Sequence, residues 1–473
     1  MGLDVACKFG GSSVANSGQI RKVEKIVDSD NNRKYIVVSA PGTDKDNPYK
    51  ITDMLYNLFY DSRKSRRNAE RNTGKNAFSN YRRIDLSQEE LLKNILDRYS
   101  VIAADLGVGT DLIGSFGKEL QNLLKDKKAT VDDVASRGEN FHARLIARYL
   151  DARFVDAKDI IYIDKKNNPD NDKTMNMIKG LTALKDRRIV IPGFYGNTDV
   201  NTKNPKIKTF ARGGSDLTGA LIAAGVDAKL YENWTDQDGI LCVDPRIFDD
   251  PKEAEKIPVI DIMTFKECRE LTYSGFSVLN DETVGPIRKR HIPINIRNTN
   301  NPSKRGTMIT SMISKSDRRQ AIVGIAGRDG FCTIDIEKYM MNKETGFGQG
   351  VLEAISKRKI NFEHMPSGID DMSIIIEEKA LEPFKDEIVT EIKRKFNPDN
   401  IKVTPDLALI SIVGEGMFYQ VGIAARAAGC LAKNNINIEI LNQGASESNV
   451  IIGVASKDYK KGIKSLYKEF LKP

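Results

Sequence analysis

The chain has no long hydrophobic run, and this absence excludes several classes of protein. No stretch of its 473 residues reaches the roughly 18 continuous apolar residues that a membrane-spanning helix needs. Residues 1–8 also lack the basic and apolar regions of a secretory signal. We therefore expect a cytoplasmic protein without a membrane partner.

Cysteine and histidine are scarce. The five cysteines are scattered without a CxxC pair, so the sequence predicts neither a disulfide framework nor a thiolate metal site. Only three histidines exist, His142, His291 and His364, and none lies in a glycine-rich motif. We expect no metal-binding set of side chains.

What is present is typical of a globular protein. Hydrophobic residues make up 40% of the chain and charged residues 29%, and 473 residues are enough for two to four domains. The net charge is +8, and the densest basic run falls within residues 62–83. Only Phe78 and Tyr81 interrupt that run as aromatics, so no regular stacking platform for nucleic acid appears. A solvated surface segment without a nucleic-acid partner is the simpler interpretation.

The first 300 residues alternate between strand and helix patterns. Apolar runs at residues 3–9 and 34–40 end in glycine or proline, and helical patterns follow each of them. Further strands are predicted at 154, 160–163, 189–192 and 229–234, with helical patterns over 88–150, 175–184 and 217–224. This alternation predicts an α/β fold with a mostly parallel central sheet between two layers of helices.

The pattern of predicted strands and helices changes after a cluster of Asn, Pro, Ser and Gly at residues 298–306. Two strand–helix–strand units follow, at 321–377 and 406–456, and the first is expected to include a strand at 361–366. This pattern indicates an internal duplication. We predict a first domain at 1–304 and two small modules at 305–390 and 391–473, with interleaving of the two modules left open.

The first motif, Lys8-Phe9-Gly10-Gly11-Ser12-Ser13, lies at a strand end. Glycines there allow backbone N–H groups to converge on an anion, and Lys8 adds a positive charge, so the motif can cradle phosphate. It is neither a Walker loop nor a GxGxxG turn. A purely structural turn between strand and helix explains it equally well.

The second motif, Arg212-Gly213-Gly214-Ser215-Asp216, precedes another helix. The Arg212 guanidinium matches a carboxylate, and Asp216 could hold Lys8 or position a metal. The competing interpretation is that Ser215 or Asp216 simply caps the helix.

Two weaker motifs complete the set. Residues 234–246 contain Thr235, Asp236, Asp244 and Arg246, which suit ribose, phosphate or magnesium but are also ordinary turn residues. Glu139, within a helical region, could bind a substrate ammonium group or could be an exposed helix residue.

Together these motifs, in this order and spacing, resemble the aspartokinases, and the resemblance covers nearly the whole chain. It implies an amino-acid-kinase domain followed by two ferredoxin-like (βαββαβ) ACT modules. It also implies transfer of the γ-phosphoryl group of ATP, with Mg²⁺, to the β-carboxylate of L-aspartate, and feedback control by an amino acid. Because the chain ends at Pro473 without a further nucleotide-binding unit, we expect a monofunctional enzyme.

The resemblance implies a role for each motif residue. The catalytic residues would be Lys8, Asp216 and Arg212. The substrate contacts would be Ser39, Thr52, Glu139, Arg212 and Ser215. The nucleotide contacts would be Lys8, Phe9, Gly10, Gly11, Ser12, Gly213, Gly214, Thr235, Asp236, Asp244 and Arg246.

The sequence departs from the common family pattern at two places in the nucleotide site. Many members carry a lysine where this chain has Ser277, and a tyrosine where it has Leu241. Arg246 or Lys252 could compensate. The basic stretch at 62–83 is a further departure without a functional interpretation.

The tail resembles the effector-binding edge of a first ACT module, through Met341, Glu344, Gly346, Phe347, Glu363 and Ser367. Glu363 would receive the ammonium of a free amino acid. Lysine is the expected effector, because Glu344 or Asp370 could receive its side-chain amine. Paired ACT modules also imply a homodimer or a dimer of dimers, although a plain dimerisation surface would look much the same.

Two other functions stay open on the residues alone. The same fold could phosphorylate glutamate, carbamate or a nucleoside monophosphate, although Arg212 and the ACT-like tail disfavour this. The chain could also be an amino-acid sensor with a degenerate kinase domain, an alternative motivated by Ser277 and Leu241.

Overall fold

The computed structural model describes residues 4–63, 81–164, 168–198, 206–211, 213–276, 281–314, 320–444 and 448–472, to which every structural statement below refers. The chain forms two compact units. Unit 1 comprises Met1–Ile240, Val259–Phe265 and Val278–Ile313, and unit 2 comprises Leu241–Pro258, Lys266–Ser277 and Ser314–Pro473. No helix of the described chain is both long and apolar enough to cross a bilayer.

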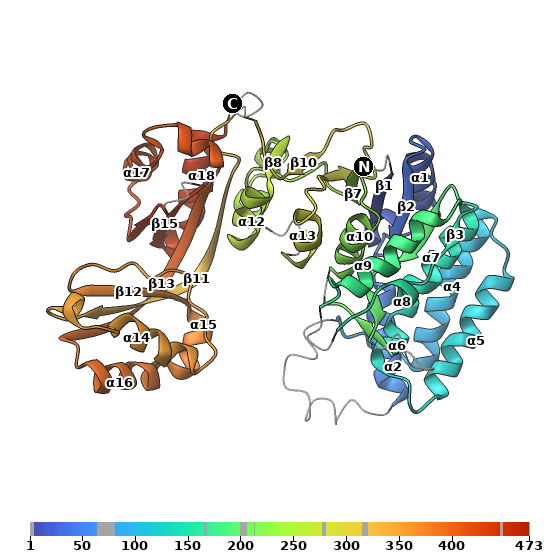
Figure 1. Ribbon diagram of the computed structural model, residues 1–473, viewed down its shortest axis with the longest axis horizontal. Helices are drawn as coiled ribbons and strands as arrows, with labels where there is room; N and C mark the ends of the chain where they lie inside the picture. Colours follow the sequence, from blue (N-terminus) through green and yellow to red (C-terminus); the bar gives the residue numbers. More distant parts are fainter. Residues whose placement is uncertain are drawn as a thin grey trace. The chain divides into compact units, whose positions relative to one another are not determined.

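Unit 1 is built on an eight-stranded sheet in the order β3-β4-β2-β1-β7-β9-β10-β8 (Figure 1). Neighbouring strands are parallel except β9 and β10, which are antiparallel. The strands are β1 (Val5–Phe9), β2 (Arg33–Val38), β3 (Arg153–Phe154), β4 (Ile189–Pro192), β7 (Leu230–Thr235), β8 (Ile262–Thr264), β9 (Ile294–Asn298) and β10 (Thr307–Thr310). The central strands are buried on both faces, which explains their continuous apolar runs.

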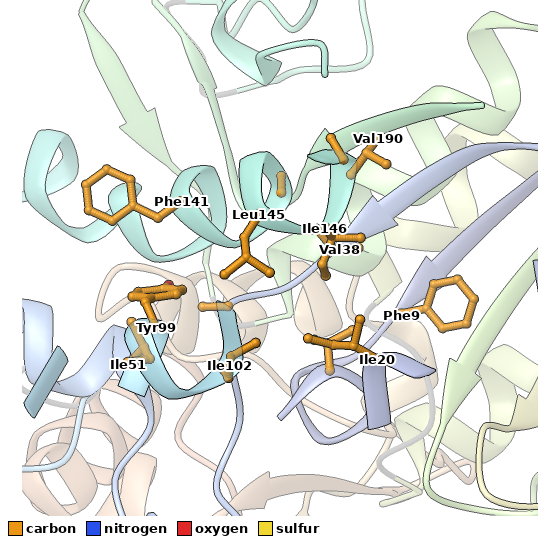
Figure 2. Packing of buried hydrophobic residues seen from close by; sticks show 14 of the residues in the cluster. Phe9, Ile20, Val38, Ile51, Tyr99, Ile102, Phe141, Leu145, Ile146 and Val190 are labelled. Atoms are coloured by element: carbon orange, nitrogen blue, oxygen red, sulfur yellow. The ribbon is translucent and has the colours of Figure 1, made fainter. Parts of the chain in front are cut away.

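Helices cover both faces of this sheet. The helices on one face are α1 (Ser17–Asp28), α2 (Ile51–Ser62), α4 (Gln88–Leu106), α5 (Asp111–Lys125) and α7 (Arg137–Tyr149). Figure 2 shows apolar side chains of α1, α2, α4 and α7 together with Phe9, Val38 and Val190 of the strands. The other face carries α10 (Gly214–Gly225), which packs against α9 (Asp172–Lys179) and α13 (Asp281–Arg288).

The two-residue period of β1 divides its side chains between these layers. Val5, Cys7 and Phe9 belong to the core under α1 and α7, whereas Lys8 points to the α10 side. A charged residue inside a buried strand is thereby directed at the beginning of α10. The expected three-layer α/β fold is confirmed.

The strand expected at 160–163 is wrong. Residues 157–160 form the short helix α8 (Ala157–Ile160), because the Asp156 side chain caps it by accepting from the Lys158 N–H at 3.2 Å. After it, Tyr162 makes only an isolated bridge to Asn197. Asn197 belongs to a hairpin formed by β5 (Tyr195–Asn197) and β6 (Ile207–Thr209). Of the apolar run, only Ile160 lies in the helix. Residues 161–163 pair with Asn197 alone, through two backbone hydrogen bonds of 2.8 Å, so a regular strand does not form.

Unit 2 contains a five-stranded antiparallel sheet in the order β12-β11-β13-β15-β14. Its strands are β11 (Gly324–Glu337), β12 (Asp371–Glu377), β13 (Asn400–Val413), β14 (Ile440–Asn442) and β15 (Asn449–Ala455). Its longer helices are α14 (Phe347–Ser356), α16 (Lys385–Phe396), α17 (Ile423–Lys433) and α18 (Tyr459–Phe470), with α12 (Phe265–Tyr273) joining at Lys266. Strands β11 and β13, each 14 residues long, run through both halves of the sheet, so the two predicted modules share one sheet.

The strand expected at 361–366 is also absent as a regular element. His364 and Ser367 make isolated bridges to Ile375 and Met372 of β12. Pro366 lies between them and has no N–H to donate, so a continuous ladder cannot form there. The segment is nevertheless held beside β12, because Ser373 N–H donates to the Pro366 carbonyl at 3.0 Å.

Candidate active site

The predicted site residues of unit 1 gather at one edge of its sheet. Strands β1, β2, β4 and β7 are parallel, so their carboxyl ends, at Phe9, Val38, Pro192 and Thr235, lie at the same edge. In open parallel sheets this edge is where ligands bind.

Lys8 is the central charge at this edge. Its side chain is only 10% exposed, and its ammonium lies 2.5 Å from Asp216 Oδ1. Asn233 of β7 supports the pair, because its amide nitrogen donates to the same Asp216 oxygen at 3.0 Å and its amide oxygen lies 3.5 Å from Lys8 Nζ. Because an isolated buried ammonium is costly, Asp216 both stabilises Lys8 and fixes the position of its ammonium group.

Asp216 is brought to Lys8 by the start of α10. Gly213 precedes this helix with φ of +90°, a conformation that favours glycine. A side chain on Gly214 would place its Cβ 2.6 Å from Phe210 Cβ, so this position also requires glycine. The glycines of the second motif therefore have a structural reason, and they direct the beginning of α10 toward β1.

The glycines of the first motif leave room beside Lys8. A Cβ at Gly10 would lie 3.4 Å from Lys8 Nζ, and a Cβ at Gly11 would lie 3.1 Å from the Ala40 carbonyl oxygen. Ser12 is exposed at the same turn. Phe9 differs from the others, because its ring is in the core (Figure 2) and only its backbone faces the turn. The ring is stacked on Trp234, with 5.9 Å between the ring centroids.

Glu139 lies next to this turn, on α7. Its side chain is buried, and Oε2 has no hydrogen-bond partner among the described residues. Burial raises the pKa of the Glu139 carboxyl from its ordinary value of 4.5 to about 8, and a backbone hydrogen bond from Ala40 opposes the shift. An orphaned buried carboxyl oxygen of this kind is suited to receive a cationic group of a ligand.

His142, one turn further along α7, holds the loop after β2. Its Nδ1 lies 2.8 Å from the Ser39 carbonyl oxygen. Burial lowers the pKa of His142 to about 3, so the ring is neutral and Nδ1 is the donor. This contact could not be inferred from the sequence, because the partner of His142 is a backbone carbonyl 103 residues away.

The remaining predicted substrate residues lie near the same edge. Ser39 follows β2, and its N–H donates to the Phe9 carbonyl at 3.2 Å. Thr52 is half-buried in the first turn of α2. Ser215 is buried at the start of α10 beside Gly193, where a Cβ would lie 2.6 Å from Ser215 Oγ. Gly193, which the motif analysis missed, thus makes room for Ser215.

Two predicted positions lie outside the described residues. These are Arg212, the expected carboxylate ligand, and Ser277, the expected departure in the nucleotide site. Most of the basic stretch at 62–83 lies outside them as well.

The predicted nucleotide contacts after β7 fall in different units. Thr235 and Asp236 end β7 in unit 1, where the Thr235 hydroxyl donates to Asp236 at 3.1 Å. Asp244 and Arg246 belong to unit 2, with Leu241, and bind each other at 2.6 Å. This mutual ion pair holds the pKa of Asp244 below its ordinary value, although burial opposes it.

The predicted effector residues lie in the first half of the unit 2 sheet. Met341 and Phe347 are core residues, and Gly346 caps α14 with φ of +83°. Glu363 accepts from Arg328 Nη2 at 3.0 Å, and Glu344 is paired with Lys338. Ser367 lies in the bridged segment beside β12. Both acidic groups are therefore already bound to cations of the chain itself.

No group of three or more His, Cys, Asp or Glu side chains that could hold a metal occurs within the part of the chain that the structure describes. Magnesium bound to a nucleotide takes most of its ligands from phosphate and water and needs one or two carboxylates. Asp216 and Asp236, at the Lys8 edge, are of the required type.

The chain resembles known proteins over nearly its whole length. Residues 5–298 match the amino acid kinase family, and residues 410–470 match an ACT domain. Aspartokinase 3 of Bacillus subtilis is 38% identical over 98% of both chains. The crystal structure of Clostridium acetobutylicum aspartate kinase covers 98% of this chain and 100% of its own, with 40% identity and a TM-score of 0.83. Aspartokinase III of E. coli, solved with aspartate and ADP, has 21% identity and a TM-score of 0.70 over 99% of this chain and 100% of its own, and supports the fold.

The buried Glu139 carboxyl makes stability depend on pH. Its pKa is raised in the folded state, so unfolding releases its proton between pH 4.5 and about 8, and its contribution to stability falls as pH rises through that window. Glu139→Gln removes this effect. We expect the variant to gain stability over wild type between pH 5 and pH 8, on the order of a few kcal/mol, measured as the difference in thermal midpoint at each pH.

The matched control is Glu89→Gln, which changes an exposed glutamate in the first turn of α4. It should follow the wild-type pH profile. If the thermal midpoint of Glu139→Gln also changes with pH as that of wild type does, the pKa of the Glu139 carboxyl is not raised.

Proposed function

The chain belongs to the aspartokinases, amino acid kinases that carry ACT domains, and we propose that the Lys8 edge of unit 1 is where its two substrates react. It is an ATP-dependent aspartate kinase, which forms 4-phospho-L-aspartate from ATP and the β-carboxylate of L-aspartate, in an amino-acid biosynthetic pathway. The observation that carries the proposed site is the buried Lys8–Asp216 pair between two glycine turns at the carboxyl ends of the strands.

Lys8 neutralises the transferring phosphoryl group in this proposal. Phosphoryl transfer depends on in-line positioning and on charge stabilisation, which a fixed ammonium can provide. Asp216 and Asn233 hold that ammonium at one place before substrate binds. Backbone groups of Gly10, Gly11, Gly213 and Gly214 contact the phosphates in this proposal.

The attacking group needs no general base. A free aspartate side chain has a pKa of about 3.9, so it is already ionised at neutral pH. His142 is consistent with this, because it is neutral and engaged with the Ser39 carbonyl. The chemistry reduces to holding two anions in line.

Glu139 binds the ammonium of the substrate aspartate in this proposal. The observation that supports it is the buried Oε2 without a partner. Binding of a cation would favour the ionised carboxylate and lower its pKa from the ligand-free value. Arg212 takes the substrate carboxylate, with Ser39, Thr52 and Ser215 completing the pocket.

In this proposal the nucleotide is held by Thr235, Asp236 and the two glycine turns of unit 1. The other predicted nucleotide contacts, Asp244 and Arg246, belong to unit 2, as does Leu241. When bound, Mg²⁺ supplies charge neutralisation at the phosphates.

The central role of Lys8 predicts a large kinetic effect. Lys8→Ala should lower kcat by at least about 100-fold, because a preorganised positive charge at the reacting centre is lost. The measurement is aspartate-dependent ADP release, together with thermal unfolding. Lys34→Ala is the matched control, because Lys34 lies on the adjacent strand β2 and its ammonium donates to the Leu184 carbonyl at 2.9 Å.

Near-normal turnover of a folded Lys8→Ala variant would refute the role of Lys8. Absence of aspartate-dependent turnover in wild type would instead favour the alternative of an amino-acid sensor with a degenerate kinase domain.

Lysine is the proposed feedback effector, bound near Glu363 and Glu344. Support comes from two acidic side chains that are each held by a cation of the chain, Arg328 and Lys338. An amine of a free lysine can pair with either carboxylate in place of the cation that holds it. Met341, Gly346, Phe347 and Ser367 shape the same edge.

This arrangement predicts inhibition that depends on Glu363. L-Lysine should lower aspartate kinase turnover, and Glu363→Gln should raise the lysine concentration for half inhibition about 10-fold or more, because a charge-assisted hydrogen bond is lost. Glu377→Gln is the control, since Glu377 also binds Arg328, at 3.1 Å, but is half exposed. Equal shifts in both variants would contradict a specific role for Glu363, and unchanged turnover with lysine would remove lysine as the effector.

Unit 2 is also the proposed association surface. Tyr339, Phe362 and Ile369 are large apolar side chains that are 75%, 42% and 69% exposed. Covering them with a second copy would remove apolar surface from water. Light scattering should give a multiple of the 52.8 kDa chain mass, and Ile369→Glu should reduce it, whereas a wild-type mass of one chain would contradict the proposal.

A further inference from the structure

We propose that Arg98 of α4 is a positioning residue for phosphoryl transfer, because its guanidinium ties together the two loops that hold the substrates. This inference rests on the proposed function of the Lys8 edge. The phosphate loop is defined here as residues 10–15, after β1, and the substrate loop as residues 39–50, after β2. Arg98 was not part of any motif in the sequence.

The Arg98 guanidinium binds the backbone of both loops at once. Nη2 donates to the Ala15 carbonyl of the phosphate loop at 3.1 Å and also to the Gly42 carbonyl of the substrate loop. Nη1 donates to the Tyr49 carbonyl, at the far end of the substrate loop, at 3.0 Å. One planar group therefore fixes three points of two segments that are separated along the chain.

The two loops also contact each other directly, through Gly42 and Gly11. Gly42 N–H donates to the Gly11 carbonyl at 2.9 Å. A Cβ on Gly42 would lie 2.6 Å from the Gly11 carbonyl carbon, so no side chain fits between the two backbones. Asn16 adds a second link, because its amide donates to Asp44 at 3.1 Å. The spacing of the loops is thus set by backbone contact and held by Arg98.

Arg98 is an unusual choice for a purely structural residue. Its side chain is 5% exposed, and the described contacts of its guanidinium are to carbonyl groups rather than to a carboxylate. Its Nε is buried and has no hydrogen-bond partner among the residues that the structure describes. Burying this charge is costly, and an apolar residue would fill the site without that cost. What only a planar guanidinium provides is simultaneous donation to several fixed carbonyls.

The anchor for this clamp is rigid. Helix α4 begins with a capping box at Ser87 and Glu90, and Tyr99 and Ile102 fix it in the core (Figure 2). Tyr99 also donates to the Gly138 carbonyl, next to Glu139, at 2.7 Å. Positions on α4 therefore relate the phosphate loop, the substrate loop and the Glu139 side of the site to one another.

The kinetic consequence follows from the loops that Arg98 joins. Gly10 and Gly11 on one loop hold phosphate, and Ser39 on the other holds aspartate, so the clamp sets the distance between donor and acceptor. A misplacement of about 1 Å can cost on the order of 100-fold in rate. Loss of the clamp should lower kcat more than it weakens binding of either substrate alone.

A cavity beside Arg98 makes a direct test feasible. It has a volume of about 600 Å³ and is lined by Ala15, Asn16, Asp44, Tyr49 and Arg98, among others. A guanidinium ion is small enough to enter it. Arg98→Ala should lower kcat about 100-fold. Millimolar guanidinium chloride should restore the kcat of this variant to at least a tenth of the wild-type rate. The kcat of Arg98→Lys should lie between those of wild type and Arg98→Ala.

Arg188→Ala is the matched control, because Arg188 is an equally buried arginine, next to β4, that binds Asp28 and neither loop. It should lower the thermal midpoint without lowering kcat, and guanidinium should not change its rate. Wild type with guanidinium corrects for general effects of the salt.

Three outcomes overturn the proposal. The first is a kcat of Arg98→Ala within twofold of wild type. The second is a lowered kcat that guanidinium does not restore, in a protein that is still folded at the assay temperature. The third is an equal decrease of kcat in Arg188→Ala. If wild type itself shows no aspartate-dependent turnover, the proposed function fails separately. Amide hydrogen exchange at Gly42, whose N–H donates to the Gly11 carbonyl across the two loops, then tests the clamp, and an exchange rate unchanged by Arg98→Ala overturns it.

Discussion

A buried ammonium group at the end of a parallel strand is the constraint on which the unit 1 site depends. Lys8 occupies a strand whose other side chains pack into the core, so its charge has to be met within a few ångströms. Asp216 meets it, and this requires the beginning of α10 to lie directly over the end of β1. The glycines at 213 and 214 make that approach possible, since a side chain at 214 would collide with Phe210. The charge pair and the turn geometry therefore determine each other.

The site around this pair is organised by backbone contacts as much as by side chains. His142 holds the Ser39 carbonyl, Arg98 holds three further carbonyls, and Gly42 lies against Gly11. Such an arrangement suits a reaction in which both reactants are anions and no proton has to be removed. What the protein supplies is a fixed separation, a fixed positive charge and a dry place for one carboxyl group, at Glu139.

The sequence allowed prediction of the features that are local. Strand, glycine turn and helix follow one another within a few residues, so the parallel sheet, the Lys8 turn and the Asp216 turn could all be inferred. Contacts to distant backbone could not be predicted, because His142 and Arg98 look like ordinary helix residues until their carbonyl partners are known. The strand expected at 361–366 is interrupted by a proline. The strand expected at 160–163 is reduced to one bridge, because Ile160 belongs to a capped helix and residues 161–163 pair only with Asn197. The sharing of β11 and β13 by both regulatory modules depends on pairing over long distances, which local patterns do not encode. The assigned roles of the site residues, Arg212 above all, and the cytoplasmic location stay predictions.

The ion pairs of unit 2 proposed for regulation resemble the pair of unit 1 proposed for catalysis, because each is a carboxylate held by a cation of the chain. They are Glu363 with Arg328 and Glu344 with Lys338. The central claim, however, concerns Lys8, and a crystal structure with a non-hydrolysable ATP analogue and L-aspartate tests it most directly. The account predicts Lys8 Nζ within about 3.2 Å of a phosphate oxygen, with aspartate beside Glu139. An analogue bound elsewhere, with Lys8 still facing only Asp216, would contradict it.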